Sequence, residues 1–159
     1  MERNKKKDFY LSFQLGKETF AVPVKKVLEV LQNQTITEVP DAIAFVRGVI
    51  HFRGDIIPVV DARIKFNMNK LESFVDEFIV VFEILNADKK LRLGATVDLV
   101  KDVLSFDPKD IKPIPEIGLQ YNAEYVSGLI KIDSGFIITL NVDRIFSTNE
   151  LIQLDKTYN

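Results

Sequence analysis

The chain has 159 residues, a formal net charge of −2 at pH 7 and a hydrophobic content of 47%. This length suits one domain of ordinary size, or two small lobes that share a core. Because the sequence holds no cysteine, a disulfide framework, a thiol nucleophile and a cysteine-ligated zinc are excluded. The slightly acidic charge balance argues against non-specific binding to nucleic acid, which depends on clustered Lys and Arg.

The first eight residues carry four basic and two acidic side chains, and we expect residues 1–8 to form a disordered tail. The stretch that follows is too polar for a signal-peptide core. No window approaches the ~20 consecutive apolar residues that a membrane helix needs, so we expect no insertion into a membrane. The expected domain spans residues 9–155, and its composition is typical of a soluble protein of a reducing compartment.

Alternation of apolar and polar residues with a period of two is the dominant pattern, and it predicts short β-strands. Gly16 and Lys17, between the first two alternating stretches, predict a hairpin turn. About ten such segments occur, which is typical of small barrels or a sandwich. The clearest are residues 9–15, the stretch through Phe20 and Val22, residues 91–97, and the apolar runs 78–82 and 136–140, which predict strands buried on both faces.

Two segments of the first half lack a clear strand pattern. Residues 24–31 fit either a helical turn opened by Pro23 or a strand. Asp41 is expected to cap a short turn that Gly48 ends.

The pattern changes near the C-terminus, where helical signals replace strand signals. Residues 141–146 predict one helical turn, and Ser147 with Glu150 forms a capping box. The box predicts a short helix that includes Leu151, Ile152 and Leu154, and we expect this helix to pack as a lid on a barrel.

An internal repeat relates the two halves of the chain. Residues 45–66 resemble residues 125–146 at an offset of 80, and residues 24–31 resemble residues 97–104 at an offset of 73. The motif ITEVP at 36–40 is also echoed by IKPIP. We therefore expect two similar β-lobes. The positions identical at the first offset are Val46/Val126, Gly48/Gly128, Ile50/Ile130, Ile57/Ile137 and Phe66/Phe146.

The two copies differ mainly at polar and turn positions, which the fold itself does not dictate. These positions make the first copy the better candidate for a functional surface. In the first copy they are Arg47, His51, Arg53, Gly54, Asp55 and Pro58, and in the second Ser127, Lys131, Asp133, Ser134, Gly135 and Ile138.

Enzymatic chemistry finds little support in the sequence. His51 is the only histidine, so any histidine-based triad or proton relay must use it. It lies between two apolar residues, and we expect it on a strand, pointing out of the core. Asp55 and Asp61 have no metal-spaced partner, and there is no phosphate-binding or nucleophile-elbow motif. A small β-barrel hydrolase that uses these three residues is the weaker alternative to a non-catalytic binding protein.

The segment RGVIHFRGDIIPVVDARIKF (47–66) resembles the signature of the CheW family of chemotaxis coupling proteins, approximately G-V-x-N-L-R-G-x-I-x-P-V-x-D-L-R. The resemblance implies an all-β fold of two intertwined five-stranded SH3-like barrels with a short C-terminal helix. It continues in the segments FYLSFQLGKETFAVPVKKVLEV (9–30), GATVDLVKDVLSF (94–106), IKPIPE (111–116) and YVSGLIKID (125–133).

The chain departs from the family pattern at several positions. The family's Asn-Leu before the arginine is His51-Phe52 here, Ala62 replaces a leucine, and Leu99 replaces a usual glycine. These departures remove no catalytic group, because the family has none, but His51 and Phe52 flank its most characteristic loop. A length of 159 residues leaves no room for a kinase or receiver domain, so we expect a free-standing coupling protein.

The resemblance implies an adaptor that bridges the cytoplasmic tips of methyl-accepting chemotaxis proteins to the regulatory domain of the CheA histidine kinase. It points to Val27, Glu29, Arg53 and Phe78 for receptor binding, with Glu29 and Arg53 as an ion pair beside a groove.

For kinase binding, the resemblance points to barrel edges near Gly48, Val100 and Val103. We expect no catalytic residues, metal or cofactor, a monomer when alone, and a cytoplasmic protein recruited to inner-membrane receptor arrays. The same adaptor chemistry in a chemosensory pathway other than chemotaxis stays open.

Overall fold

The computed structural model describes residues 8–68, 78–114 and 124–156, which form ten strands, two α-helices and three short 3-10 helices. Most of the predicted tail lies outside the described residues, and Asp8, its last residue, already belongs to the first strand. No helix of the described ranges is long and apolar enough to cross a membrane.

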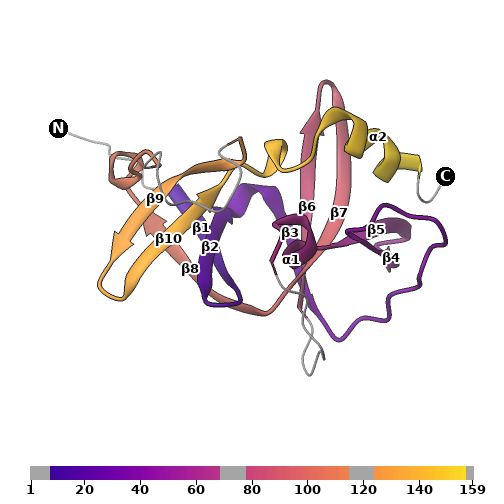
Figure 1. The fold of residues 1–159 in the computed structure, drawn as a ribbon, viewed down its shortest axis with the longest axis horizontal. Helices are drawn as coiled ribbons and strands as arrows, with labels where there is room; N and C mark the ends of the chain where they lie inside the picture. Colours follow the sequence, from indigo (N-terminus) through magenta and orange to yellow (C-terminus); the bar gives the residue numbers. More distant parts are fainter. Residues whose placement is uncertain (1–7, 69–77, 115–123, 157–159) are drawn as a thin grey trace.

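The strands form two five-stranded sheets, which we call lobe A and lobe B (Figure 1). Lobe A contains, in order across its sheet, β8 (Leu99–Phe106), β1 (Asp8–Leu15), β2 (Glu18–Pro23), β10 (Gly135–Leu140) and β9 (Val126–Ile132). Lobe B contains β3 (Val27–Gln32), β6 (Phe78–Asn86), β7 (Lys89–Val97), β5 (Asp55–Asp61) and β4 (Val46–Phe52). This architecture confirms the predicted all-β fold and the count of about ten strands.

Each lobe is built from both halves of the chain, so the lobes are intertwined. In Figure 1 the indigo β1 and β2 lie beside the orange β9 and β10, whereas β3 to β5 join the later β6 and β7. Both lobes contain one parallel pair, in which Ala21 lies opposite Thr139 in lobe A and Gly94 lies opposite Val59 in lobe B. These four residues are related by the same offsets of 80 and 73, so strand pairing confirms the internal repeat.

The length of the connections explains the exchange of strands. β7 ends at Val97, whose partner is Phe78 at the open end of the β6–β7 hairpin. In the structure Leu99 lies beside Gln14 of β1. The residue of β6 that corresponds to Gln14 in the repeat is Glu83, so a barrel made from the second half alone would need Leu99 beside Glu83. That position is five residues from Phe78, or about 17 Å along the strand. One intervening residue, Asp98, lets the chain advance at most about 7 Å, so β8 crosses to the other lobe.

The largest hydrophobic cluster lies between the lobes and is contributed by both of them. Aromatic rings run through it in series: Phe13 to Phe20, Phe20 to Phe66 and Phe66 to Tyr125, with ring centroids 5.8, 5.6 and 5.0 Å apart. Each lobe also has a smaller interior cluster of its own. Central strands such as β2 and β6 lie between the main cluster and the smaller cluster of their lobe. These strands are therefore buried on both faces, as the apolar run 78–82 predicted for β6.

Residues 24–31, which fitted either a helical turn or a strand, contain both. Residues Val24–Lys26 form the 3-10 helix η1, and β3 starts at Val27. A second 3-10 helix, η2, spans Pro108–Asp110 after β8.

The predicted C-terminal elements are present as the 3-10 helix η3 (Val142–Arg144) and the helix α2 (Thr148–Lys156). The capping box is confirmed, since the Glu150 N–H donates to Ser147 Oγ at 3.1 Å and the Ser147 N–H donates to Glu150 Oε1 at 2.8 Å. The helix packs through Leu151 and Leu154, which are buried, whereas the side chain of Ile152 is 45% exposed.

Gly48 does not end a turn, which corrects the expectation for residues 41–48. It lies inside β4 with φ 152°, and a Cβ atom there would lie 2.1 Å from the Thr37 carbonyl oxygen. Thr37 and Val49 exchange two backbone hydrogen bonds of 2.8 and 2.9 Å, which hold the preceding loop against β4. Gly128 has the same role in β9, where Lys112 pairs with Leu129.

Candidate functional site

The β4–β5 turn presents the most distinctive polar group of the first repeat copy. Phe52 pairs with Asp55, so the loop consists of Arg53 and Gly54 alone. Their φ angles are 50° and 85°, the pattern of a type I′ turn, which requires positive φ at both positions. Gly54 adopts this conformation freely, whereas Arg53 does so at a cost of about 1–2 kcal/mol.

The Arg53 guanidinium is held by three neighbours. Its Nη2 lies 2.9 Å from Glu29 Oε1 and 3.4 Å from the Leu28 carbonyl oxygen, both on β3. Its Cζ lies 4.7 Å from the centroid of the Phe52 ring. The predicted pair of Glu29 and Arg53 is therefore present, with side chains 44% and 53% exposed. Asp55, on the other side of the turn, pairs instead with Arg92 at 3.2 Å.

The other two residues predicted for receptor binding do not join this pair in one cluster. Val27 and Phe78 are both half-buried against the main core. Val27 lies opposite Phe82, whereas Phe78 lies opposite Gln32, so they occupy opposite ends of the β3–β6 ladder. Over this length of strand they are separated by roughly 15 Å.

The residues predicted for kinase binding divide between the lobes. Val100 and Val103 lie on β8, the end strand of the lobe A sheet, whereas Gly48 is buried in β4 of lobe B. Val103 is 58% exposed, but Val100 packs against the main core. The structure thus brings together two of the three residues.

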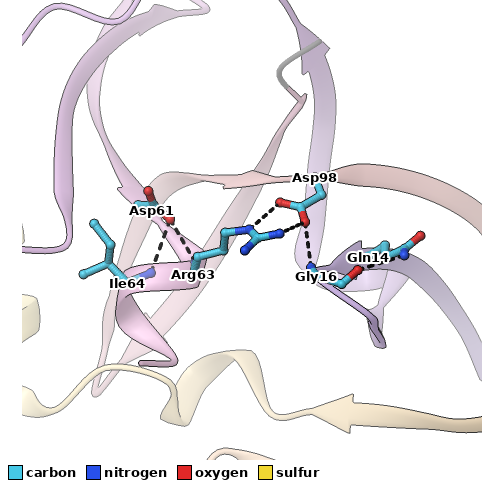
Figure 2. Close-up of polar contacts among 6 residues, drawn as sticks. All are labelled: Gln14, Gly16, Asp61, Arg63, Ile64 and Asp98. Carbon is cyan, nitrogen blue, oxygen red and sulfur yellow. Dashed lines mark hydrogen bonds and ion pairs between the residues drawn. The ribbon is translucent and has the colours of Figure 1, made fainter. Parts of the chain in front are cut away.

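A polar cluster that the sequence reasoning missed joins the lobes around Asp98, between β7 and β8 (Figure 2). Arg63 donates from Nε to Asp98 Oδ1 at 2.9 Å and from Nη2 to Oδ2 at 2.5 Å. The Gly16 N–H, in the β1–β2 turn, donates to the same Oδ2 at 2.6 Å. We call these three residues the Asp98 cluster. The signals available in the sequence were an acid between two predicted strands, Asp98, and the arginine at the end of the family signature, Arg63.

The side chain of Arg63 is 12% exposed, and its hydrogen bond to Asp98 is the main cause of its raised pKa. Arg63 belongs to the short helix α1 (Ala62–Lys65), which Asp61 caps by accepting from the Arg63 N–H at 2.9 Å and the Ile64 N–H at 3.3 Å (Figure 2). The cap orients the start of α1, so the guanidinium faces Asp98.

A second polar cluster occupies the corresponding place after β10 and β2. Asp143, in η3, pairs with Lys26 at 2.8 Å and accepts from the Leu85 N–H of β6 at 2.9 Å. We call these residues the Asp143 cluster. In the Asp98 cluster the base follows β5 and the acid follows β7, whereas here the acid follows β10 and the base follows β2. The side chains of this second pair are also more exposed, at 23% for Lys26 and 31% for Asp143.

The three residues considered for hydrolysis do not converge. His51 is exposed on β4, as predicted, and Asp55 lies at the turn end of β5 in its pair with Arg92. Asp61 is 2% exposed at the opposite end of β5, about 20 Å away along the strand. Within the described ranges, no three His, Cys, Asp or Glu side chains are arranged to hold a metal ion.

The sequence and the fold of this chain are similar to those of known proteins. Residues 10–150 match the family model of the CheW-like domain. The chain is 30% identical over 146 residues to the chemotaxis protein CheW of Treponema pallidum, covering 91% of this chain and 85% of that protein. It is 32% identical to the chemotaxis protein CheW of Klebsiella aerogenes, covering 92% and 86%. The crystal structure of the scaffolding protein TtCheW from Thermoanaerobacter tengcongensis is similar with a TM-score of 0.78 and 30% identity, covering 91% and 95%.

Proposed function

Because this chain belongs to the CheW family of chemotaxis coupling adaptors, we propose that it joins its two partners through separate surfaces, one on each lobe. The partners are the cytoplasmic tips of chemoreceptors and the regulatory domain of the CheA histidine kinase. The proposed mechanism has no catalytic step. Simultaneous binding raises the effective concentration of kinase at the receptor, so a change in receptor conformation can shift the kinase equilibrium.

The observation that carries this proposal is the placement of two unlike surfaces on different lobes. Lobe B carries the exposed ion pair of Glu29 and Arg53, and lobe A carries the end strand β8 with the exposed apolar side chains Leu99 and Val103. A bridging protein needs two surfaces that can be occupied together. The core between the lobes and the two polar clusters fix the distance between them.

We assign receptor binding to the surface around Glu29 and Arg53, with Val27 and Phe78 as apolar positions on the same β3–β6 ladder. An exposed ion pair of this kind contributes under about 1 kcal/mol to folding. It can nevertheless contribute to recognition, because a partner that buries it strengthens its electrostatic interactions.

We assign kinase binding to the exposed edge of β8, with Val103 as the central contact and Val100 behind it. Leu99, 44% exposed, extends the apolar edge. In this assignment Gly48 acts indirectly, because its missing side chain lets the Thr37 loop lie on β4.

The proposal is tested by calorimetry of the purified protein with each partner separately: a receptor-tip fragment and the kinase regulatory domain. Arg53→Glu should weaken receptor binding at least tenfold and leave kinase binding unchanged, whereas Val103→Asp should do the reverse. Val103→Thr is the matched control, because it keeps the branched shape without adding charge. Val100→Asp is a poorer probe, since Val100 packs against the core and the change would also lower stability.

Two results would contradict the assignment. If either variant weakened binding of the receptor tip and of the kinase domain equally, the two partners would share one surface. Binding of neither partner by the folded protein would move the adaptor to another chemosensory pathway. The remaining parts of the proposal are a monomer in the absence of partners, which sedimentation measures, and recruitment from the cytoplasm to inner-membrane receptor arrays, which fluorescence microscopy of the tagged chain measures.

A further inference from the structure

Arg53 occupies a backbone conformation that its residue type disfavours. The first position of a type I′ turn is best filled by Asn, Asp or Gly. The equivalent loop of lobe A, Asp133 and Ser134, has no positive φ at either position, and the adjacent Gly135 takes φ 140° instead. The fold therefore does not require this strain at a charged residue, and the side chain of Arg53 needs another explanation.

The residue before the turn supplies part of that explanation. Phe52 is 4% exposed and belongs to the interior cluster of lobe B with Ile50 and Ile57, so its ring is fixed by packing. The guanidinium lies over this ring, 4.7 Å from its centroid, in the geometry of a cation–π interaction. The family pattern has leucine at this position, and an aliphatic side chain has no negative ring face to attract a cation.

The fixed ring also orients the free part of the guanidinium. Nη2 is occupied by Glu29 and the Leu28 carbonyl, whereas Nε and Nη1 donate no hydrogen bond within the described residues. These donors are therefore available for acceptor oxygens of a bound protein, such as a carboxylate or the last carbonyls of a helix.

We propose that Phe52 is a positioning residue of the receptor surface: its ring holds Arg53 in the orientation that a receptor tip binds, so less side-chain entropy is lost on association. This inference rests on the receptor role proposed above for Arg53.

The test combines receptor-tip binding with an observation of Arg53 that needs no partner. Calorimetry is carried out on the full chain, on Phe52→Leu, on Arg53→Gln and on the double variant. NMR measures the ring-current shift of the Arg53 δ protons in the free protein. Phe52→Tyr, which keeps the ring, is the matched control, and kinase-domain affinity reports whether each variant is intact.

We expect Phe52→Leu to weaken receptor binding about two- to fivefold, to abolish the ring-current shift and to leave kinase binding unchanged. In the Arg53→Gln background the same change should have no further effect, and Phe52→Tyr should behave like the parent chain.

Each contrary result identifies what failed. A ring-current shift that persists in Phe52→Leu would overturn the positioning role, as would equal weakening in both backgrounds. An Arg53→Gln variant that binds the receptor tip as well as the parent, with the shift still lost in Phe52→Leu, would overturn the receptor role of Arg53 itself.

Discussion

The hairpins β4–β5 and β9–β10 are two copies of one structure that differ only where the fold leaves them free. Both pair through the same register at an offset of 80, and both carry a β-bulge beside a glycine that a neighbouring loop covers. Their inward positions, such as Ile50 and Ile130, are buried in both. Their outward and turn positions diverge, and Arg53 in one corresponds to Asp133 in the other. Packing therefore conserves the scaffold, while the exposed turn of one copy carries the candidate site.

The largest effect expected from this comparison comes from the two covered glycines. Gly48→Ala would place a Cβ atom 2.1 Å from the Thr37 oxygen at a φ of 152°, whereas Gly128→Ala would place one 2.4 Å from Ile111 Cγ2. We expect losses of about 3 and about 2 kcal/mol in the free energy of unfolding. Denaturant titration measures both, and a Gly48→Ala variant as stable as the parent would show that the Thr37 loop is not held against β4.

The next effect compares the two polar clusters between the lobes. Asp98→Ala removes the acceptor of Arg63 and of the Gly16 N–H, and it leaves the largely buried Arg63 side chain without its ion pair to Asp98. We expect it to cost about 2–3 kcal/mol, against about 1 kcal/mol for Asp143→Ala in the more exposed cluster. Thermal unfolding at low salt measures the difference. Equal losses would show that exposure does not distinguish the two clusters.

A smaller effect separates the turn conformation of Arg53 from its charge. Arg53→Asn and Arg53→Gln both remove the guanidinium, but only Asn is well suited to a φ of 50°. We expect the Asn variant to be more stable than the Gln variant by about 1 kcal/mol, while both lose receptor affinity. Denaturant titration together with calorimetry measures this pair. A Gln variant of equal stability would contradict the strain assigned to this position.

The smallest effect concerns an ionisable residue that one lobe interior has and the other lacks. Tyr10 lies in the interior cluster of lobe A, where its counterpart in lobe B is Ile79. Burial, and to a lesser extent the charge of Asp8, raises the pKa of Tyr10 above its ordinary value. The unfolded chain therefore loses this proton first, so stability is intact below about pH 10 and falls above it. Tyr10→Phe should reduce the slope of stability against pH in that range, and an unchanged slope would assign it to other groups.

Local signals in the sequence predicted local structure well. Gly16 and Lys17 form the expected turn, and Ser147 and Glu150 form the expected capping box, because both depend on neighbours within four residues. The function of Gly48 could not be predicted in this way, since the group that excludes a side chain is the carbonyl of Thr37 in a separate loop.

Contacts between residues far apart in the sequence could be predicted only from the family resemblance, or were found only in the structure. The repeat predicted two lobes, and the family resemblance predicted their intertwining, but periodicity alone does not say which strand pairs with which. The pair of Glu29 and Arg53 was predicted from the resemblance and is present. The Asp98 cluster was missed because its members come from three segments far apart in the sequence.

The one-residue connection at Asp98 has a consequence for synthesis of the protein on the ribosome. Because each lobe takes strands from both halves of the chain, β1 and β2 must wait for β10, which ends more than a hundred residues after Pro23. At roughly 5–20 residues per second, that wait lasts about 6–25 seconds. Throughout this time the nascent chain exposes unpaired strand edges with apolar faces, which makes it a substrate for chaperones that act during translation.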